Sequence, residues 1–305
     1  MNPNADLPHR NRTIMTPFTA SELLINTDGS IFHLHMKPEQ LADKVILVGD
    51  PERVAAIGHF MENVESTCQN REFHSLTGYY GNKRITVVST GIGCDNIDIV
   101  LNELDALANI DFNERCIKPT LRSLQIVRIG TCGGLQDYTP EGTFVASQIS
   151  IGLDGLLNFY GRRNEVCDEQ AEAAFTGHMQ WHGAQGIAHP YAVHADEELL
   201  QRIARTDMTR GITVSCGGFY GPQGRCLRIP LADPQQNEKI EHFAYQGLHI
   251  TNFEMESSAV AGLSRLLGHK AMTCCMVIAN RVAGKAIVNY QQRMHTLIET
   301  VLQRI

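Results

Sequence analysis

The chain has 305 residues, of which 43% are hydrophobic and 19% charged, as in ordinary globular proteins with a substantial core. Its net charge of −7, from 26 basic and 33 acidic residues, argues against a surface for nucleic acid or an anionic membrane. The start has no apolar signal core, and no stretch approaches the ~20 apolar residues that cross a bilayer. The nine cysteines form no CxxC pair, so we expect reduced thiols in a cytoplasmic protein.

Residues 1–30 are polar and predict a loosely ordered N-terminal arm, after which apolar runs alternate with helical patterns. The predicted strands cover residues 45–48, 84–89, 124–129, 250–253 and 271–278. The predicted helices begin at Pro51 with Asp50 as N-cap, after the glycine turn at 90–93, at Glu256 and near Asn289. This alternation indicates an α/β fold around a largely buried sheet, and residues 31–305 contain no linker or repeat, so we predict one domain there.

Residues 159–194 are rich in Arg, His and Gly and lack clean periodicity, which predicts a long surface excursion from the domain. Within it, His178 and His182 have the i, i+4 spacing of a metal-binding pair on a helix. No acidic base or third ligand is adjacent in the sequence. We therefore predict solvated histidines and no metal site.

Two motifs at strand ends are candidate anion sites. Gly49 to Arg53 joins a buried strand to a helix start, where free backbone N–H groups and a guanidinium favour an anion. A turn with a surface arginine is the alternative. Arg128 is the penultimate residue of an apolar strand, and Thr131 lies in the glycine-rich run after it. Burying Arg128 is costly unless an anion pairs with it, and that anion is either a ligand or a carboxylate of the protein.

The segment from Thr251 to Ser257 contains two glutamates around Met255, where a strand becomes a helix. Glu256 is a candidate acceptor for the vicinal hydroxyls of a sugar, and Met255 offers a soft apolar floor. Acidic residues also favour the first turn of a helix, so the two glutamates can have different roles. His33 lies in a short apolar patch, where a histidine alone is more often structural.

A loop shaped by Gly and Pro carries Phe219, Gln223 and Arg225. An amide and a guanidinium two residues apart can be presented to one planar heterocycle, with an aromatic ring to stack on it. On its own the motif fits any turn. Gly91-Ile92-Gly93 lacks the third glycine and the downstream acid of a dinucleotide site, which argues against a dehydrogenase.

In this order, the motifs GDPER, NREF, STGIG, VRIGTCGG, FYGPQGR, EMES and ANR resemble the nucleoside phosphorylase superfamily of uridine phosphorylases and hexameric purine phosphorylases. The likeness runs with gaps from about Ile31 to the C-terminus. It implies a single-domain, three-layer αβα fold with a central mixed, partly barrel-like β-sheet. It also implies a pentosyltransferase that converts uridine and phosphate to uracil and ribose 1-phosphate in pyrimidine salvage or catabolism, with phosphate as co-substrate and no cofactor.

The resemblance also assigns roles to individual residues. The phosphate ligands would be Gly49, Arg53, Arg71, Arg128 and Thr131. The ribose contacts would be His33, Met255 and Glu256. The base contacts would be Phe219, Gln223, Arg225 and Ile278. The catalytic set would be Arg53, Arg128, Arg225 and Glu256. Arg71 and His33 would serve the site of a neighbouring subunit, which implies a homodimer as the minimum unit and allows a hexamer.

The choice of base and of acceptor rests on two further features. Purine-cleaving relatives carry a Ser-Asp pair where this chain has Ala279-Asn280, so the acid that protonates a purine is missing, which favours uridine. Three retained arginines favour phosphate over water as the acceptor. The alternatives are a purine phosphorylase or nucleosidase of the same fold, and a non-catalytic nucleoside-binding protein. Departures from the family are residues 215–218, Asn96 in place of a serine at a family cation site, and the excursion at 159–194.

Overall fold

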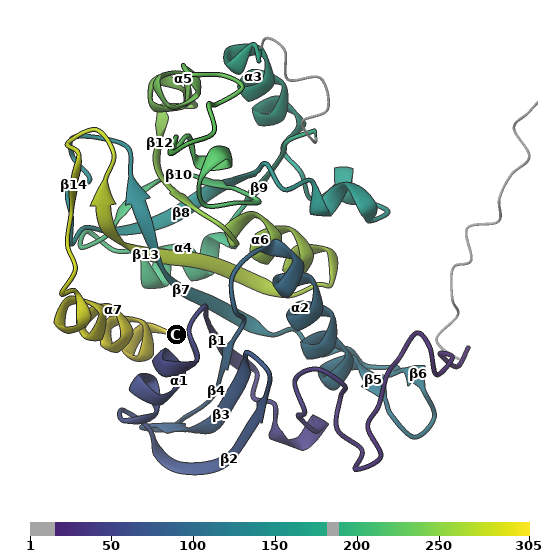
Figure 1. Cartoon of the computed structure of the whole chain (residues 1–305). Helices are drawn as coiled ribbons and strands as arrows, with labels where there is room; N and C mark the ends of the chain where they lie inside the picture. Colours follow the sequence, from purple (N-terminus) through teal and green to yellow (C-terminus); the bar gives the residue numbers. More distant parts are fainter. Residues whose placement is uncertain (1–15, 182–188) are drawn as a thin grey trace, which may run out of the picture.

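A computed structural model describes residues 16–181 and 189–305 (Figure 1). Most strands join one mixed sheet: β1 (Lys44–Val48), β2 (Glu62–Asn70), β3 (Phe73–Tyr80), β4 (Lys83–Ser89), β7 (Gln125–Gly134), β8 (Phe144–Gly152), β9 (Tyr191–His194), β10 (Thr209–Ser215), β11 (Ala244–Tyr245), β12 (Leu248–Glu254), β13 (Lys270–Asn280) and β14 (Lys285–Ala286). A separate hairpin is formed by β5 (Ile110–Asp111) and β6 (Cys116–Ile117).

The helices of the described residues are α1 (Pro51–Gly58), α2 (Cys94–Asn109), α3 (Glu169–Met179), α4 (Glu197–Ile203), α5 (Gln236–His242), α6 (Ser257–Leu266) and α7 (Gln291–Arg304). None of them is long and apolar enough to cross a membrane.

The main sheet runs in the order β11-β12-β10-β8-β13-β7-β1-β4-β3-β2. Strand β12 also pairs with β7, through Asn252 opposite Gly134 and Phe253 opposite Gly133, so the strands β7, β13, β8, β10 and β12 close into a ring. The pairs β1–β4, β1–β7 and β13–β7 are parallel, whereas β13–β8 and β12–β7 are antiparallel. The expected mixed, partly barrel-like sheet is therefore confirmed.

The alternation of side chains along β1 explains the layers. Val45 and Leu47 belong to a core cluster with residues of α2 and α6, whereas Ile46 and Val48 belong to a second cluster with residues of α1, α4 and α7. All four side chains are fully buried. Because both faces of this parallel strand are covered, its sequence is continuously apolar. The helix layers on the two sides of the sheet are visible in Figure 1.

The predicted strands and helices match the observed ones except at their ends. The main difference is β7, which continues through the glycine-rich run to Gly134 rather than ending at residue 129. The glycines allow this course. A Cβ atom on Gly134 would lie 2.6 Å from the carbonyl oxygen of Thr139, and one on Gly130 would lie 2.5 Å from Nη1 of Arg128. The last two residues of the strand, Gly133 and Gly134, have no side chains and pair with β12.

The expectation of an arm at residues 1–30 falls partly outside the described residues. Residues 16–30 form turns that are held to the β5–β6 hairpin. Arg115 donates from Nε to the carbonyl oxygen of Phe18 and from Nη2 to that of Thr19, both at 2.9 Å. This part of the arm is therefore anchored by hydrogen bonds to the domain.

The described residues of the segment 159–194 do not form the predicted surface excursion. It contains α3, capped by Asp168, whose side chain accepts from the N–H of Ala171. Phe175 and Met179 of α3 are fully buried in a core cluster. Strand β9, in the same segment, pairs antiparallel with β8. The helix was not predicted because its buried apolar side chains occupy only three positions, each four residues from the next. The sequence also predicts that His178 and His182 are solvated, but His182 lies outside the described residues.

If α3 is part of the core, Phe175→Ala should lower the free energy of unfolding by about 3–5 kcal/mol, because it leaves a cavity at a fully buried site. Phe159→Ala is the matched control, since Phe159 is in the same segment but 89% exposed. It should change stability by less than about 0.5 kcal/mol. Urea unfolding of both variants measures this, and equal losses would contradict the structure.

Candidate active site

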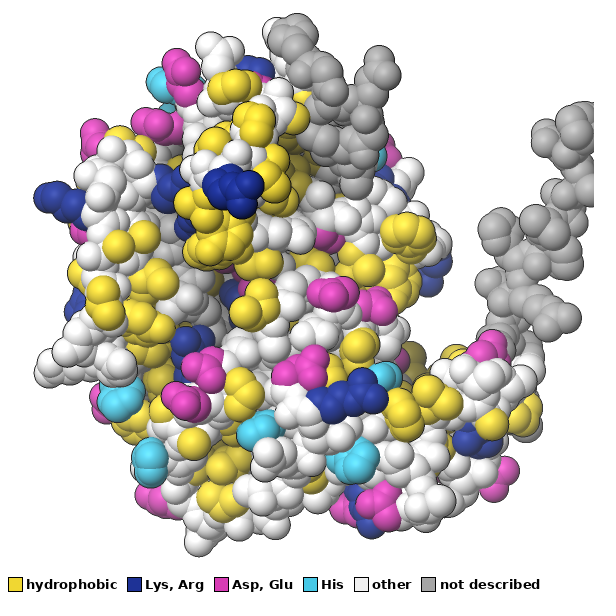
Figure 2. Space-filling view, in the orientation of Figure 1, with side chains coloured by type: hydrophobic (Ala, Val, Ile, Leu, Met, Phe, Trp, Pro, Cys, Tyr) yellow, Lys and Arg dark blue, Asp and Glu magenta, His cyan; other side chains and the backbone are white. Residues whose placement is uncertain are grey.

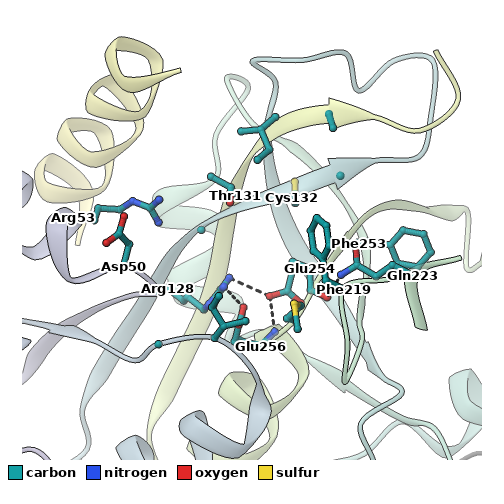
Figure 3. Close-up of a pocket in the computed structure, with 18 of the residues that line it drawn as sticks. Asp50, Arg53, Arg128, Thr131, Cys132, Phe219, Gln223, Phe253, Glu254 and Glu256 are labelled. Atoms are coloured by element: carbon teal, nitrogen blue, oxygen red, sulfur yellow. Dashed lines mark hydrogen bonds and ion pairs between the residues drawn. The ribbon is translucent and has the colours of Figure 1, made fainter. Parts of the chain in front are cut away.

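One cavity of about 720 Å³ lies at the carboxyl ends of the strands β1, β4, β7, β12 and β13, next to the loop at 219–225. It is lined by ten of the twelve residues assigned to a site from the sequence: Gly49, Arg53, Arg128, Thr131, Phe219, Gln223, Arg225, Met255, Glu256 and Ile278. In Figure 3, Arg53 and Asp50 lie at one end, Phe219 and Gln223 lie at the other, and Arg128, Glu254 and Glu256 lie between them. Motifs far apart in the sequence thus form one elongated site.

The end of the cavity beside α1 is suited to an anion. The side chain of Asp50 accepts from the N–H of Glu52 and so caps α1, with Pro51 in the first turn, as the sequence predicts. Arg53 lies one turn into the helix and donates from Nη1 to the carbonyl oxygen of Ile129 at 3.4 Å. Burial lowers the pKa of Arg53 below its ordinary value. Its guanidinium is only weakly engaged within the chain and can bind an anion.

Arg128 is buried between two carboxylates (Figure 3). Its Nη1 lies 3.1 Å from Oε2 of Glu254, and its Nη2 forms an ion pair with Oε2 of Glu256. Burial opposes the charge, but Glu256 and Glu254 outweigh it and raise the pKa of the guanidinium above its ordinary value. The carboxylate alternative left open from the sequence is therefore present, and Arg128 also lines the cavity.

The two glutamates have different tasks. Glu254 accepts from the N–H groups of Glu256 and Ser257, at 2.8 and 2.9 Å, and from the hydroxyl of Ser215 at 2.6 Å. It is therefore the residue that caps α6. Glu256 accepts from the N–H of Gly93 at 2.6 Å, and its carboxylate is directed into the cavity beside Arg128. Burial raises its pKa above 4.5, against the opposing effect of Arg128.

The loop at the opposite end holds Arg225 and Gln223 together. Arg225 donates from Nη1 to Oε1 of Gln223 at 2.5 Å and to the carbonyl oxygen of Phe219 at 2.6 Å. Its guanidinium lies over the Phe219 ring, 3.7 Å from the centroid, so one face of this ring is covered by Arg225. Burial and the neighbouring Arg281 lower the pKa of Arg225 to about 10. At neutral pH it still carries its charge.

Asn280 ends β13 beside this loop without lining the cavity. Its Nδ2 donates to the carbonyl oxygens of Gln136 and Thr139, at 3.0 and 2.9 Å, and its Oδ1 accepts from the N–H of Ala283 at 2.7 Å. Both ends of the amide are therefore bound to backbone. The side chain has no proton to give to a ligand in the cavity.

His33 and Arg71 are the two predicted site residues that do not line the cavity. They lie close together on the surface, because Nδ2 of Asn70 donates to the carbonyl oxygen of His33 at 2.8 Å. Arg71 is exposed, with a positive φ of 53°, at the turn between β2 and β3. The next residue, Glu72, reaches the rim of the cavity and accepts from Asn96 at 3.3 Å. The pair thus lies beside the site without entering it.

Comparison with known proteins assigns the fold to a family. The model of the phosphorylase superfamily matches residues 43–304. The chain belongs to this superfamily. It is 27% identical over 276 residues to the uridine phosphorylase of Thermococcus kodakarensis, which covers 88% of this chain and 84% of that protein. A DeoD-type purine nucleoside phosphorylase of Bacillus velezensis is 24% identical, over 90% of this chain and 98% of that protein.

A solved superfamily structure is also similar. The nucleoside phosphorylase of Trypanosoma brucei, described as showing uridine phosphorylase activity, superposes with a TM-score of 0.81 at 28% identity. The match covers 93% of this chain and 100% of that one. Membership in the superfamily therefore rests on sequence and structure together.

Some residues that line the cavity had not been assigned to the site from the sequence. Cys132, Phe253 and Ala279 add apolar surface to the cavity, and Tyr290 lies near Arg53. Cys132 and Ala279 are adjacent to assigned residues and Phe253 lies two positions before Met255, so the motifs contained a signal for them. Tyr290 precedes the last helix, outside every motif. Among the described residues no cluster of three or more His, Cys, Asp or Glu side chains is arranged to hold a metal ion.

The buried position of Arg128 makes it a structural residue as well as a site residue. Arg128→Ala leaves two carboxylates buried without their partner, and we expect it to lower the free energy of unfolding by about 3–5 kcal/mol. Arg53→Ala breaks only a weak hydrogen bond, and we expect a loss below about 1 kcal/mol. Chemical denaturation measures both. The triple variant Arg128→Met, Glu254→Gln, Glu256→Gln should recover much of the loss, and equal effects at both arginines would contradict this reading.

Proposed function

We propose that this chain is a uridine phosphorylase, which converts uridine and inorganic phosphate to uracil and ribose 1-phosphate. The observation that carries the proposal is one cavity in which Arg53 lies at one end, Arg128 and Glu256 lie in the middle, and Gln223 lies at the other end, where it accepts from Arg225. These three parts match the charges and hydrogen-bonding groups of phosphate, ribose and a pyrimidine. The named activities of the relatives support the same reaction.

Cleavage of an N-glycosidic bond develops positive charge on the sugar and negative charge on the departing base. Arg53 and Arg128 hold the phosphate nucleophile on one face of the ribose, and its negative charge stabilises the sugar cation. Glu256 accepts from the ribose hydroxyls while its ion pair with Arg128 keeps it in place. Catalysis on this scheme is positioning and electrostatic preorganisation, with no covalent enzyme intermediate.

The base end favours a pyrimidine. Arg225 is charged at neutral pH and stabilises negative charge on the pyrimidine oxygens, while Gln223 supplies an amide that both donates and accepts. A purine leaves more readily when its ring nitrogen is protonated, and this requires an acid. Asn280 is an amide bound to three backbone groups and offers none.

The charges of the cavity support a second copy of the chain as part of the site. The lining has one more carboxylate than guanidinium. The guanidiniums are those of Arg53, Arg128 and Arg225, and the carboxylates are those of Asp50, Glu72, Glu254 and Glu256. A phosphate dianion in this setting needs a further cation. Arg71 and His33 lie together on the surface of the same chain, available to a neighbour's site. A homodimer is the minimum unit of this proposal.

The wider setting of the reaction is also a proposal. The enzyme acts in pyrimidine salvage or catabolism in the cytoplasm, with phosphate as co-substrate and without metal or organic cofactor. On the face drawn in Figure 2, acidic and basic side chains are interspersed, which fits a small-molecule substrate rather than a polyanion.

A panel of nucleosides with and without phosphate tests the reaction. We expect uridine to be cleaved with phosphate, with ribose 1-phosphate as product, and at least about 100-fold more slowly without it. Inosine should be cleaved at least about 100-fold more slowly than uridine, because the site lacks the acid. Release of base followed by absorbance measures both. Equal rates for the two nucleosides, or a rate indifferent to phosphate, would refute the assignment.

Mixing two inactive variants tests the shared site. Arg53→Ala damages the site of its own chain, whereas Arg71→Ala damages the site of the neighbour. In a mixed dimer one site has both arginines, so unfolding and refolding an equal mixture should restore about a quarter of wild-type activity. Each variant refolded alone is the control. A mixture that is no more active than its components would show that Arg71 does not act across an interface.

A further inference from the structure

Glu103, on α2, binds the segment that carries His33. Its carboxylate accepts from the backbone N–H of His33 at 3.0 and 3.1 Å, from that of Leu34 at 2.8 Å and from Nδ1 of the His33 ring at 2.7 Å. None of the sequence motifs includes Glu103, and the cavity lining does not contain it. Its hydrogen bonds nevertheless all go to this one short segment and its imidazole.

These contacts determine which ring nitrogen carries the proton. A carboxylate has no proton to donate, so Nδ1 must be the donor in the 2.7 Å hydrogen bond. In the neutral imidazole, Nε2 is then the acceptor. No hydrogen bond from residues 16–181 or 189–305 reaches Nε2. The His33 side chain is 24% exposed, and Nε2 is not one of the described chain's buried polar atoms without a hydrogen-bond partner, so this atom is accessible to a molecule outside the chain.

The direction of the ring is fixed from other sides as well. Phe32 and Phe73 contact it edge to face, with centroids at 4.8 and 6.2 Å, and Phe73 is buried. Asn70 holds the carbonyl oxygen of His33. Among residues 16–181 and 189–305, Glu103 makes the only hydrogen bond to the ring itself. Its removal therefore frees the imidazole to turn or to change tautomer.

We propose that Glu103 is a positioning residue, which holds His33 with Nε2 directed outward to accept a hydrogen bond from the 5′-hydroxyl of a nucleoside in the neighbouring copy's site. This inference rests on the function proposed above, in which His33 serves that site, and on the family resemblance, which implies that this histidine contacts the ribose 5′-hydroxyl. It makes selection for a nucleoside with a free 5′-hydroxyl depend on a carboxylate that never touches the substrate.

Uridine and 5′-deoxyuridine differ in that hydroxyl alone, so the ratio of their kcat/KM values reports on the contact. We expect the wild-type ratio to favour uridine by about 10-fold or more, and His33→Ala to bring it near unity. Glu103→Ala should lower the ratio towards that of His33→Ala. Glu103→Gln keeps the volume but has one accepting atom for three donors, and its ratio should lie between those of the wild type and Glu103→Ala.

Asp105 supplies the matched control. It is on the same helix, and its carboxylate also pairs with a histidine, at 3.3 Å from Nε2 of His269. It also accepts from Asn109 at 2.6 Å. Asp105→Asn should disturb α2 to a similar degree and leave the ratio unchanged. In the double variant His33→Ala, Glu103→Ala the ratio should equal that of His33→Ala alone, because Glu103 acts through the ring.

The outcomes separate the two levels of the proposal. A wild-type protein that does not cleave uridine with phosphate, or a His33→Ala variant with the wild-type ratio, overturns the role given to His33 and this inference with it. An active wild type whose Glu103 variants both retain the full ratio overturns the inference alone. So does an additional effect of Glu103→Ala on the ratio when His33 is already absent.

Discussion

The site depends on one buried ion-paired arginine. Arg128 lies on an apolar strand inside the sheet, where a guanidinium is stable only because Glu254 and Glu256 face it. Those carboxylates are at the end of β12 and at the start of α6, so the charge of Arg128 ties three elements together. Glu254 in turn caps α6 through the N–H groups of Glu256 and Ser257. The contacts that stabilise the buried charge of Arg128 therefore also fix the position of Glu256, the proposed acceptor of the ribose hydroxyls.

The ring of strands explains how these residues meet. Strand β12 pairs antiparallel with β7 at Gly133 and Gly134, the last two residues of β7. The pairing brings the residues after Phe253 next to the residues after Arg128, although they are far apart in the sequence. The middle of the cavity, with Arg128 and Glu256, is therefore built on this pairing. A side chain at Gly134 would clash with Thr139 and disturb it.

Much of this arrangement was predictable, because most of the motifs follow an apolar strand and the carboxyl ends of parallel strands meet at one edge of a sheet. Arg53, Thr131 and Met255 fall in the cavity for this reason. The division of labour between Glu254 and Glu256 was not predictable, since it depends on where β12 ends and α6 begins. Nor was the stacking of Arg225 on Phe219, which depends on the conformation of an irregular loop. Roles were assigned to His33 and Arg71 only from the resemblance to a family, because the surrounding sequence does not show which site a surface residue serves.

The hydrogen bonds of Asn280 have a consequence for how base preference can change in evolution. Its Nδ2 donates to two carbonyl oxygens, and its Oδ1 accepts from a backbone N–H. An aspartate there would place an oxygen against those carbonyls and would leave them without a donor. It would also point into the backbone rather than towards a ligand. A descendant of this protein could therefore not acquire purine chemistry by exchanging this one side chain, because the turn that follows β13 would have to be rebuilt along with it.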